Sequence, residues 1–163
     1  DTGSHTMKLA SLKHGRDGRL VLVSRDLRRA VDATHIAATL QTALDDWDRH
    51  STELQELYAE LNAGQAPGAF DFDPHACAAP LPRAYQWADG SAYINHVELV
   101  RASRNSEVPA NFYEDPLMYQ GGSDDFLGPC DDIVAVSADH GIDFGLRSVC
   151  NVCRFSYVFW WHG

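Results

Sequence analysis

Cysteine and basic residues are both scarce in this chain. Its 163 residues include four cysteines, at positions 77, 130, 150 and 153, far fewer than the dense frameworks that cross-link small secreted folds. We therefore expect reduced thiols and a cytoplasmic protein. The 13 Lys and Arg residues against 23 Asp and Glu give a net charge of −10, which repels a phosphate backbone. This charge balance disfavours a nucleic-acid partner.

Long apolar runs and a leader pattern are also missing. No uninterrupted apolar stretch approaches the roughly 18 residues of a membrane span, and the first residues show no basic region followed by an apolar run. We therefore expect no membrane partner. Residues 1–6 look like a cloning remnant before Met7. The hydrophobic fraction of 45% suffices for a globular core.

Residues 7–70 show the pattern of a small α+β domain. The turn residues of 15–18 separate two apolar stretches, which predicts a β-hairpin. Apolar residues then recur at helical spacing and predict two amphipathic helices; they are Ile36, Leu40, Ala43, Leu44 and Trp47, then Leu54, Leu57, Tyr58 and Leu61. Thr52 and Gln55 have the spacing of a capping box, and Gly64 is placed to end the second helix.

Residues 71–82 are rich in Pro and Ala, which discourages regular structure and favours a linker. A second region begins at about residue 83. In it, the apolar spacing of residues 91–104 predicts a helix with one buried face. Residues 115–129 predict an ordered loop, and residues 133–136 predict a strand.

The segment Trp87–Glu98 holds the residues with the clearest chemical potential. If it is helical, Asp89 and His96 lie seven positions apart on nearly the same face, separated by about 10 Å along the axis. A carboxylate there suits a hard cation, and a neutral imidazole can take a proton from water. A helix-capping aspartate and a routinely hydrogen-bonded histidine have the same spacing, so spacing alone favours the plainer interpretation.

Three stretches together resemble a known family: Pro80–His96, which contains Asp-x6-His; residues 115–123, which contain Tyr-x-Gly; and Phe126–Pro129. They resemble the fumarylacetoacetate hydrolase family, closest to bacterial members with a small N-terminal domain, over about residues 7–144. The resemblance implies an α+β fold, with the N-terminal domain followed over residues 83–144 by the start of a mixed β-roll. It implies that Asp89 is a metal ligand, that His96 is the base that activates water, and that Tyr119 contacts substrate.

The family resemblance also implies a reaction. Family members bind Mg²⁺, Mn²⁺ or Ca²⁺, and the metal chelates a diketo acid, polarises its carbonyl and stabilises the leaving carbanion or enolate. Hydrolysis splits a carbon–carbon bond into two acids, as with fumarylacetoacetate in aromatic amino acid catabolism; relatives hydrolyse acylpyruvates or decarboxylate oxaloacetate. The implied partners are a small-molecule keto acid and a second subunit in a homodimer.

The chain departs from this family after Phe144. Where the pattern has Glu-x-Glu, which supplies two metal ligands, it has Gly145-Leu146-Arg147, and a positive charge there weakens cation binding. Residues 145–163 form a divergent aromatic tail, explained either by an altered reading of the gene or by true divergence. The alternative function is therefore a non-catalytic fragment or interaction module.

Two weaker candidates for a metal site remain. Cys150, Cys153 and His162 could supply three ligands of a zinc site, but a structural site needs four, so ordinary thiols are the better interpretation. The acidic pairs at positions 124–125 and 131–132 are more simply explained as solvated loop charges.

Overall fold

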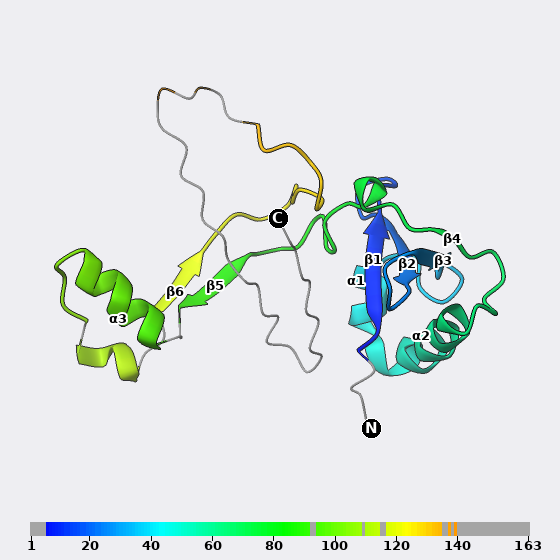
Figure 1. Cartoon of the computed structure of the whole chain (residues 1–163), viewed down its shortest axis with the longest axis horizontal. Coiled ribbons are helices and arrows are strands. Elements are labelled where there is room, and N and C mark those ends of the chain that lie inside the picture. Colours follow the sequence, from blue (N-terminus) through cyan, green and yellow to red (C-terminus); the bar gives the residue numbers. More distant parts are fainter. Residues whose placement is uncertain are drawn as a thin grey trace. The chain divides into compact units, whose positions relative to one another are not determined.

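The computed structural model describes residues 6–91, 94–108, 110–114 and 117–134, together with residues 137 and 139. For six of these the description is confined to the backbone: Asp89, Gly90, Ser91, His96, Leu117 and Tyr119. The chain divides into two units (Figure 1). We call Asp1–Arg83 with Asp125–Gly163 the N-terminal unit, and Ala84–Asp124 the ribbon unit.

The N-terminal unit is built on an antiparallel sheet with the strand order β1-β2-β3-β4. Its strands are β1 (Lys8–Leu12), β2 (Arg19–Val23), β3 (Arg29–Asp32) and β4 (Phe70–Asp71). The predicted hairpin is confirmed, because β1 pairs with β2 from Lys8↔Val23 to Leu12↔Arg19. Its turn needs glycine at position 18, where φ is +73° and a Cβ atom would lie 2.9 Å from that of Ser11.

The two predicted helices are confirmed as α1 (Leu40–Asp45) and α2 (Trp47–Asn62). The first begins later than the apolar pattern, because the Thr39 side chain caps it by accepting from the Thr42 N–H at 3.1 Å. The predicted capping box is wrong: Thr52 lies inside α2, which starts directly after the break at Asp46. Gly64 does end α2, with its N–H on the Leu61 carbonyl and the Gln65 N–H on Glu60, the Schellman pattern.

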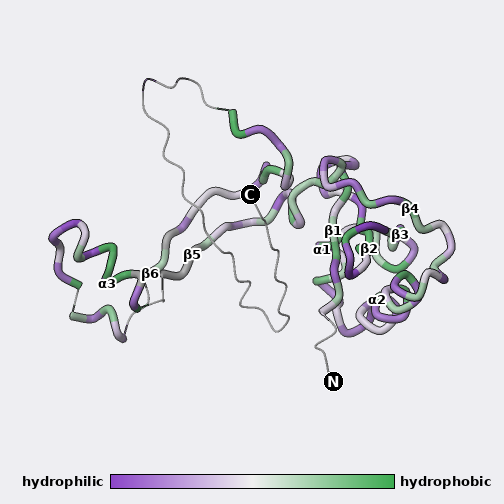
Figure 2. The backbone as a smooth tube through the Cα atoms, viewed as in Figure 1, coloured by the Kyte–Doolittle hydropathy of each residue, from purple (hydrophilic) through white to green (hydrophobic). Residues whose placement is uncertain are grey.

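Both faces of the sheet are covered. On one face, Leu9, Leu20, Leu22 and Val31 form a cluster with the apolar side of α2, at Leu54, Leu57, Tyr58 and Leu61. Hydrophobic and hydrophilic residues accordingly alternate along α2 (Figure 2). The other face holds a smaller cluster of Leu12, Val21, Val23 and Cys77. Residues 20–23 of β2 are therefore buried on both faces. The predicted α+β class is correct for this unit.

Residues 71–82, which we expected to form a linker, are attached to β1. The Ala78 N–H donates to the Ser11 carbonyl at 2.9 Å, and the Ser11 hydroxyl donates to the Pro80 carbonyl at 2.7 Å. Cys77 pairs with Leu12 in an isolated antiparallel β-bridge. A short 3-10 helix, η1 (Pro74–Ala76), precedes this contact. Proline prevents a regular helix here, but an extended chain can still pair along the edge of a sheet.

The ribbon unit contains β5 (Ala88–Ser91), α3 (Ile94–Ser103), η2 (Ala110–Tyr113) and β6 (Leu117–Gln120). The helix predicted for residues 91–104 is therefore confirmed, with shorter bounds. The loop predicted for residues 115–129 is wrong in part, because it contains β6, which pairs with β5.

The strand predicted for residues 133–136 is not formed in its described part. Ile133 and Val134 have no regular structure and are 76% and 86% exposed, so neither has the cross-strand partner that stabilises a strand. Residues 135 and 136 lie outside the described residues. The continuation into a mixed β-roll stays a prediction. In the described segments, no helix combines the length and the apolar character needed to cross a bilayer.

Candidate functional site

Two of the three predicted site residues occupy opposed positions in the ribbon unit. β5 and β6 are antiparallel, and Asp89 is the direct register partner of Tyr119, between the pairs Ala88↔Gln120 and Gly90↔Met118. Opposed Cα atoms in such a pair lie only about 4.5–5.5 Å apart. The backbone therefore brings together two positions that are 30 residues apart in the sequence.

His96 lies on the next element along the chain. It is the third residue of α3, which starts three positions after β5 ends. The condition that Trp87–Glu98 forms one helix is not met, because Asp89 belongs to a strand and His96 to a helix. The seven-residue helical spacing therefore does not relate them. What relates them is the short connection from β5 to α3, which keeps their backbones close along the chain.

Packing around α3 involves the segment that follows it. Val97 and Phe112 are buried, at 7% and 5% exposure, and the rings of Phe112 and Tyr113 meet edge to face at 5.7 Å. The Tyr113 hydroxyl donates to Glu98 Oε1 at 3.0 Å. This hydrogen bond and the Glu98 charge raise the pKa of Tyr113. The hydrogen bond from Tyr113 to Glu98 thus connects η2 to α3.

Trp87 and Gly121, at the base of the strand pair, are residues that sequence reasoning missed. The Gly121 N–H donates to the Trp87 carbonyl at 2.8 Å, and the Trp87 N–H donates to the Gly122 carbonyl at 3.0 Å. The Trp87 ring lies against Gly121. The sequence signal was a pair of glycines directly after a strand-like stretch, which often marks a bulge or a close backbone approach.

No three His, Cys, Asp or Glu residues gather in a metal-binding group within the described residues. Because Asp89 and His96 are described by their backbone alone, that finding does not test them as ligands. The structure does not describe Arg147, Cys150, Cys153 or His162. The weaker cation binding expected from Arg147 therefore stays a prediction, and so does the interpretation of the two cysteines as ordinary thiols.

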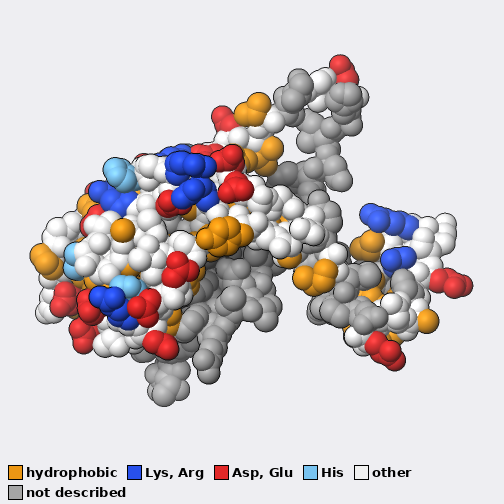
Figure 3. Space-filling view, turned by 180° about the vertical axis from the view of Figure 1, so that it is seen from behind, with side chains coloured by type: hydrophobic (Ala, Val, Ile, Leu, Met, Phe, Trp, Pro, Cys, Tyr) orange, Lys and Arg blue, Asp and Glu red, His pale blue; other side chains and the backbone are white. Residues whose placement is uncertain are grey.

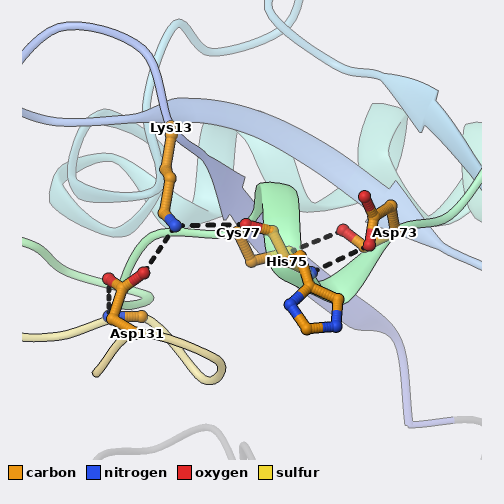
Figure 4. A network of polar contacts seen from close by, with 6 residues as sticks. Lys13, Asp73, His75, Cys77 and Asp131 are labelled. Atoms are coloured by element: carbon orange, nitrogen blue, oxygen red, sulfur yellow. Dashed lines mark hydrogen bonds and ion pairs between the residues drawn. The ribbon is translucent and has the colours of Figure 1, made fainter. Parts of the chain in front are cut away.

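A second polar cluster lies in the N-terminal unit (Figure 4). The Lys13 ammonium donates to the carboxylate of Asp131 and, at 3.1 Å, to the carbonyl of His75. Asp131 also accepts from the Gly128 N–H at 2.7 Å. The hydrogen bond from Lys13 lowers the pKa of Asp131. Asp131 is therefore a paired residue that holds a turn, which corrects the expectation of a solvated loop charge.

Cys77 lies beside this cluster but lacks the properties of a nucleophile. Its burial, and then the Asp73 charge, raise the pKa of the thiol to about 11, so at neutral pH it is protonated and unreactive. Across the face in Figure 3, Lys and Arg side chains stand next to Asp and Glu, with no field of one sign over the N-terminal unit. We therefore interpret the cluster as structural and place the candidate site in the ribbon unit.

Comparison with known families gives one result. Residues 7–83 match the family model described as "Fumarylacetoacetase N-terminal domain 2". A search of the curated proteins finds no match to the chain. The matched range covers β1 to β4, both helices and the segment attached to β1, and it ends where the N-terminal unit passes into the ribbon unit.

Proposed function

We propose, from the match of residues 7–83 to the fumarylacetoacetase N-terminal domain, that the chain is part of a metal-dependent hydrolase that cleaves a carbon–carbon bond in a diketo acid. Asp89 is its metal ligand, His96 its general base and Tyr119 its substrate-contacting residue. The keto acid is of the fumarylacetoacetate or acylpyruvate type.

The pairing of Asp89 with Tyr119 is the observation that carries this proposal. Directly opposed positions of an antiparallel pair are the ones whose side chains are neighbours. A metal ligand and a substrate-contacting residue both have to reach the same small molecule, so this register suits their proposed roles. His96 follows in the first turn of α3, in the element that continues from β5.

The proposed metal is one that a sparse set of protein ligands can hold. Mg²⁺ keeps several waters and binds through one or two carboxylates together with substrate oxygens. Asp89 would supply one carboxylate, and the oxygens of a diketo acid would supply further ligands. The residues fit Mg²⁺ on these terms, and we expect weak binding. When bound, the ion acts as a Lewis acid on the carbonyl group.

The protein's own residues then have separate tasks. His96 takes a proton from a water molecule, which adds as hydroxide to the carbonyl carbon. The bond between that carbon and its neighbour breaks, and the carbanion that leaves as an enolate is protonated, giving two acids. Tyr119 orients the substrate at the opposed position, which limits the geometries that the water can meet.

The test is an assay of pyruvate release from an acylpyruvate in the presence of Mg²⁺ or Mn²⁺. We expect His96→Ala to lower kcat by about 100-fold or more, since general-base catalysis contributes about that much. His14→Ala is the matched control, because His14 is exposed in the β1–β2 turn, and it should leave kcat unchanged. Wild-type turnover in His96→Ala would show that the assigned role is wrong.

The alternative function is an interaction module without catalysis. One observation favours it: the ribbon unit exposes large apolar side chains, at Tyr85, Ile94, Leu99, Tyr113 and Met118. Exposed apolar side chains of this size are available for a contact with another protein. A chain that releases no pyruvate with either metal, and that forms a stable complex lost on Leu99→Asp, would support this function and contradict the hydrolase.

A further inference from the structure

The base of the β5–β6 pair has an irregular backbone arrangement. Gly121 donates to the Trp87 carbonyl, and Gly122 accepts from the Trp87 N–H. Two successive residues directly after β6 therefore bond to a single residue directly before β5, which is locally the arrangement of a β-bulge. Bulges fix the register of the strands that they join.

The Trp87 side chain distinguishes between these two glycines. A Cβ atom built on Gly121 would overlap Cε3 of the indole and lie 3.0 Å and 3.2 Å from Cζ3 and Cδ2. A Cβ atom on Gly122 would meet nothing within 4 Å. Neither glycine has a positive φ, so backbone strain does not distinguish them. Gly121 is needed because the indole occupies the space of a side chain.

Register matters in this pair because a slip changes the partner of Asp89. A two-stranded pair is only marginally stable by itself, and a shift of one residue would place Met118 or Gln120 opposite Asp89 instead of Tyr119. The shift that brings Met118 opposite Asp89 also moves Gln120 under the Trp87 ring, where a side chain does not fit. The opposite shift places Gly122 under the Trp87 ring. Because glycine has no side chain, the ring by itself does not exclude this shift.

Backbone pairing beyond the bulge opposes that second shift. The Asp124 N–H donates to the Ala84 carbonyl at 3.0 Å, and the Phe126 N–H donates to the Pro82 carbonyl at 3.1 Å. Both hydrogen bonds join residues that the register of β5 and β6 would oppose, so the extra residue at Trp87 is compensated on the other segment between Ala84 and Trp87. Both hydrogen bonds would be lost in a shifted pair. Trp87 with Gly121 excludes one shift, and these hydrogen bonds disfavour the other.

We propose that Trp87 and Gly121 are positioning residues: the indole packed on Gly121 fixes the register that sets Tyr119 opposite Asp89. Their effect on catalysis rests on the proposed function, whereas their effect on register does not. Neither residue takes part in the reaction itself. Their role is to keep the ligand position and the substrate position opposed.

The test compares Gly121→Ala with Gly122→Ala in the whole chain. In Gly121→Ala the new methyl group displaces the indole. We expect the cross-strand NOEs between residues 88 and 120 to be lost and amide exchange in β5 and β6 to accelerate by about tenfold or more. In Gly122→Ala both should stay within about twofold of wild type. Unchanged exchange of the Leu22 amide, in the N-terminal unit, shows that the chain is still folded.

A second variant provides a rescue. Trp87→Leu combined with Gly121→Ala makes room for the methyl group, and we expect it to restore the NOEs between residues 88 and 120. Wild-type NOEs and exchange in Gly121→Ala, or equal losses in Gly121→Ala and Gly122→Ala, would overturn the proposal.

Turnover separates this proposal from the proposed function. If the chain is active, Gly121→Ala should lower kcat by about tenfold, because a small misplacement of substrate is costly, while Gly122→Ala keeps wild-type kcat. If the wild type shows no turnover but the NOE and exchange results are as expected, the hydrolase assignment is wrong. The proposal that Trp87 and Gly121 fix the register of β5 and β6 is then still supported. Turnover in the wild type with full kcat in Gly121→Ala would remove the positioning role.

Discussion

The N-terminal unit and the ribbon unit differ in how much apolar surface their described residues bury. The N-terminal unit covers both faces of its sheet, and Leu20, Val21, Leu22 and Leu54 are 0% exposed. The described part of the ribbon unit buries Val97 and Phe112, while Leu99 and Met118 are more than 60% exposed. The unit with its own core provides stability, and the unit with the candidate site depends on backbone pairing and a few contacts.

The largest expected difference between the units comes from removing a leucine side chain in each. Leu54→Ala should lower the free energy of unfolding by about 3 kcal/mol, because it leaves a cavity between α2 and the sheet. Leu99→Ala should change it by less than about 0.5 kcal/mol, because Leu99 is 63% exposed. Urea unfolding followed by circular dichroism measures both. Equal losses would mean that α3 contributes to the same core.

Thiol reactivity tests whether residues 71–82 belong to the sealed part of the N-terminal unit. Cys77 is buried and Cys130 is exposed. With a pKa of about 11, only about 0.1% of Cys77 is thiolate at pH 8. We expect iodoacetamide to alkylate Cys77 about 100-fold more slowly than Cys130, as measured by peptide mass spectrometry. Comparable rates would return this segment to the linker interpretation.

The raised pKa of Cys77 also sets a pH dependence for the stability of the N-terminal unit. The unfolded thiol ionises near its ordinary value of 9.0, and the folded thiol ionises only at about 11. The corresponding stability is full below pH 9 and is lost as the pH rises toward 11. Cys77→Ala should remove this alkaline decline in a thermal melt.

Two glycines of the β1–β2 turn give a smaller and more local comparison. Gly15 and Gly18 both have positive φ, but only Gly18 also lies against Ser11 and the Leu12 carbonyl. We expect Gly15→Ala to cost about 1 kcal/mol and Gly18→Ala about 1–2 kcal/mol more, from the added steric overlap. Denaturant unfolding measures the difference. Equal costs would show that Ser11 can move aside.

The smallest expected effect concerns the segment that Lys13 holds through Asp131. The pKa of Asp131 is lowered, so this attachment is complete above the ordinary carboxyl value of 3.8 and is lost as the pH falls through the lowered one. Pepsin should cleave residues 125–134 faster at pH 2.5 than at pH 4.5, relative to a denatured control. In Lys13→Met the ratio of the cleavage rate at pH 2.5 to the cleavage rate at pH 4.5 should be smaller. An unchanged ratio would mean that the ion pair does not hold the segment.

The same difference between the units explains what could be predicted from the sequence. In the N-terminal unit, apolar spacing follows the faces that are buried, so the hairpin, α1 and α2 were predictable. The capping box failed because Asp46 breaks the helical pattern earlier than Thr52. The attachment of residues 71–82 depends on hydrogen bonds to Ser11 across more than 60 positions, and no local pattern contains that information.

In the ribbon unit, the residue types of the site could be predicted but their arrangement could not. The sequence relates Asp89 to His96 only on the condition that one helix holds both, and residues 88–91 form β5 instead. Its opposition to Tyr119 arises from strand pairing across 30 positions, and a strand register is set by turns, bulges and contacts. Trp87 and Gly121 are contacts of this kind.

Paramagnetic broadening by Mn²⁺ tests the central claim most directly, because it reports where a divalent ion binds without requiring turnover. We predict that Mn²⁺ broadens the amide resonances of residues 88–91 and 117–120 and of His96, and that Asp89→Asn abolishes the effect. Broadening centred instead on the acidic residues 124–125 or 131–132, and unchanged in Asp89→Asn, would contradict the assignment of Asp89 as a metal ligand.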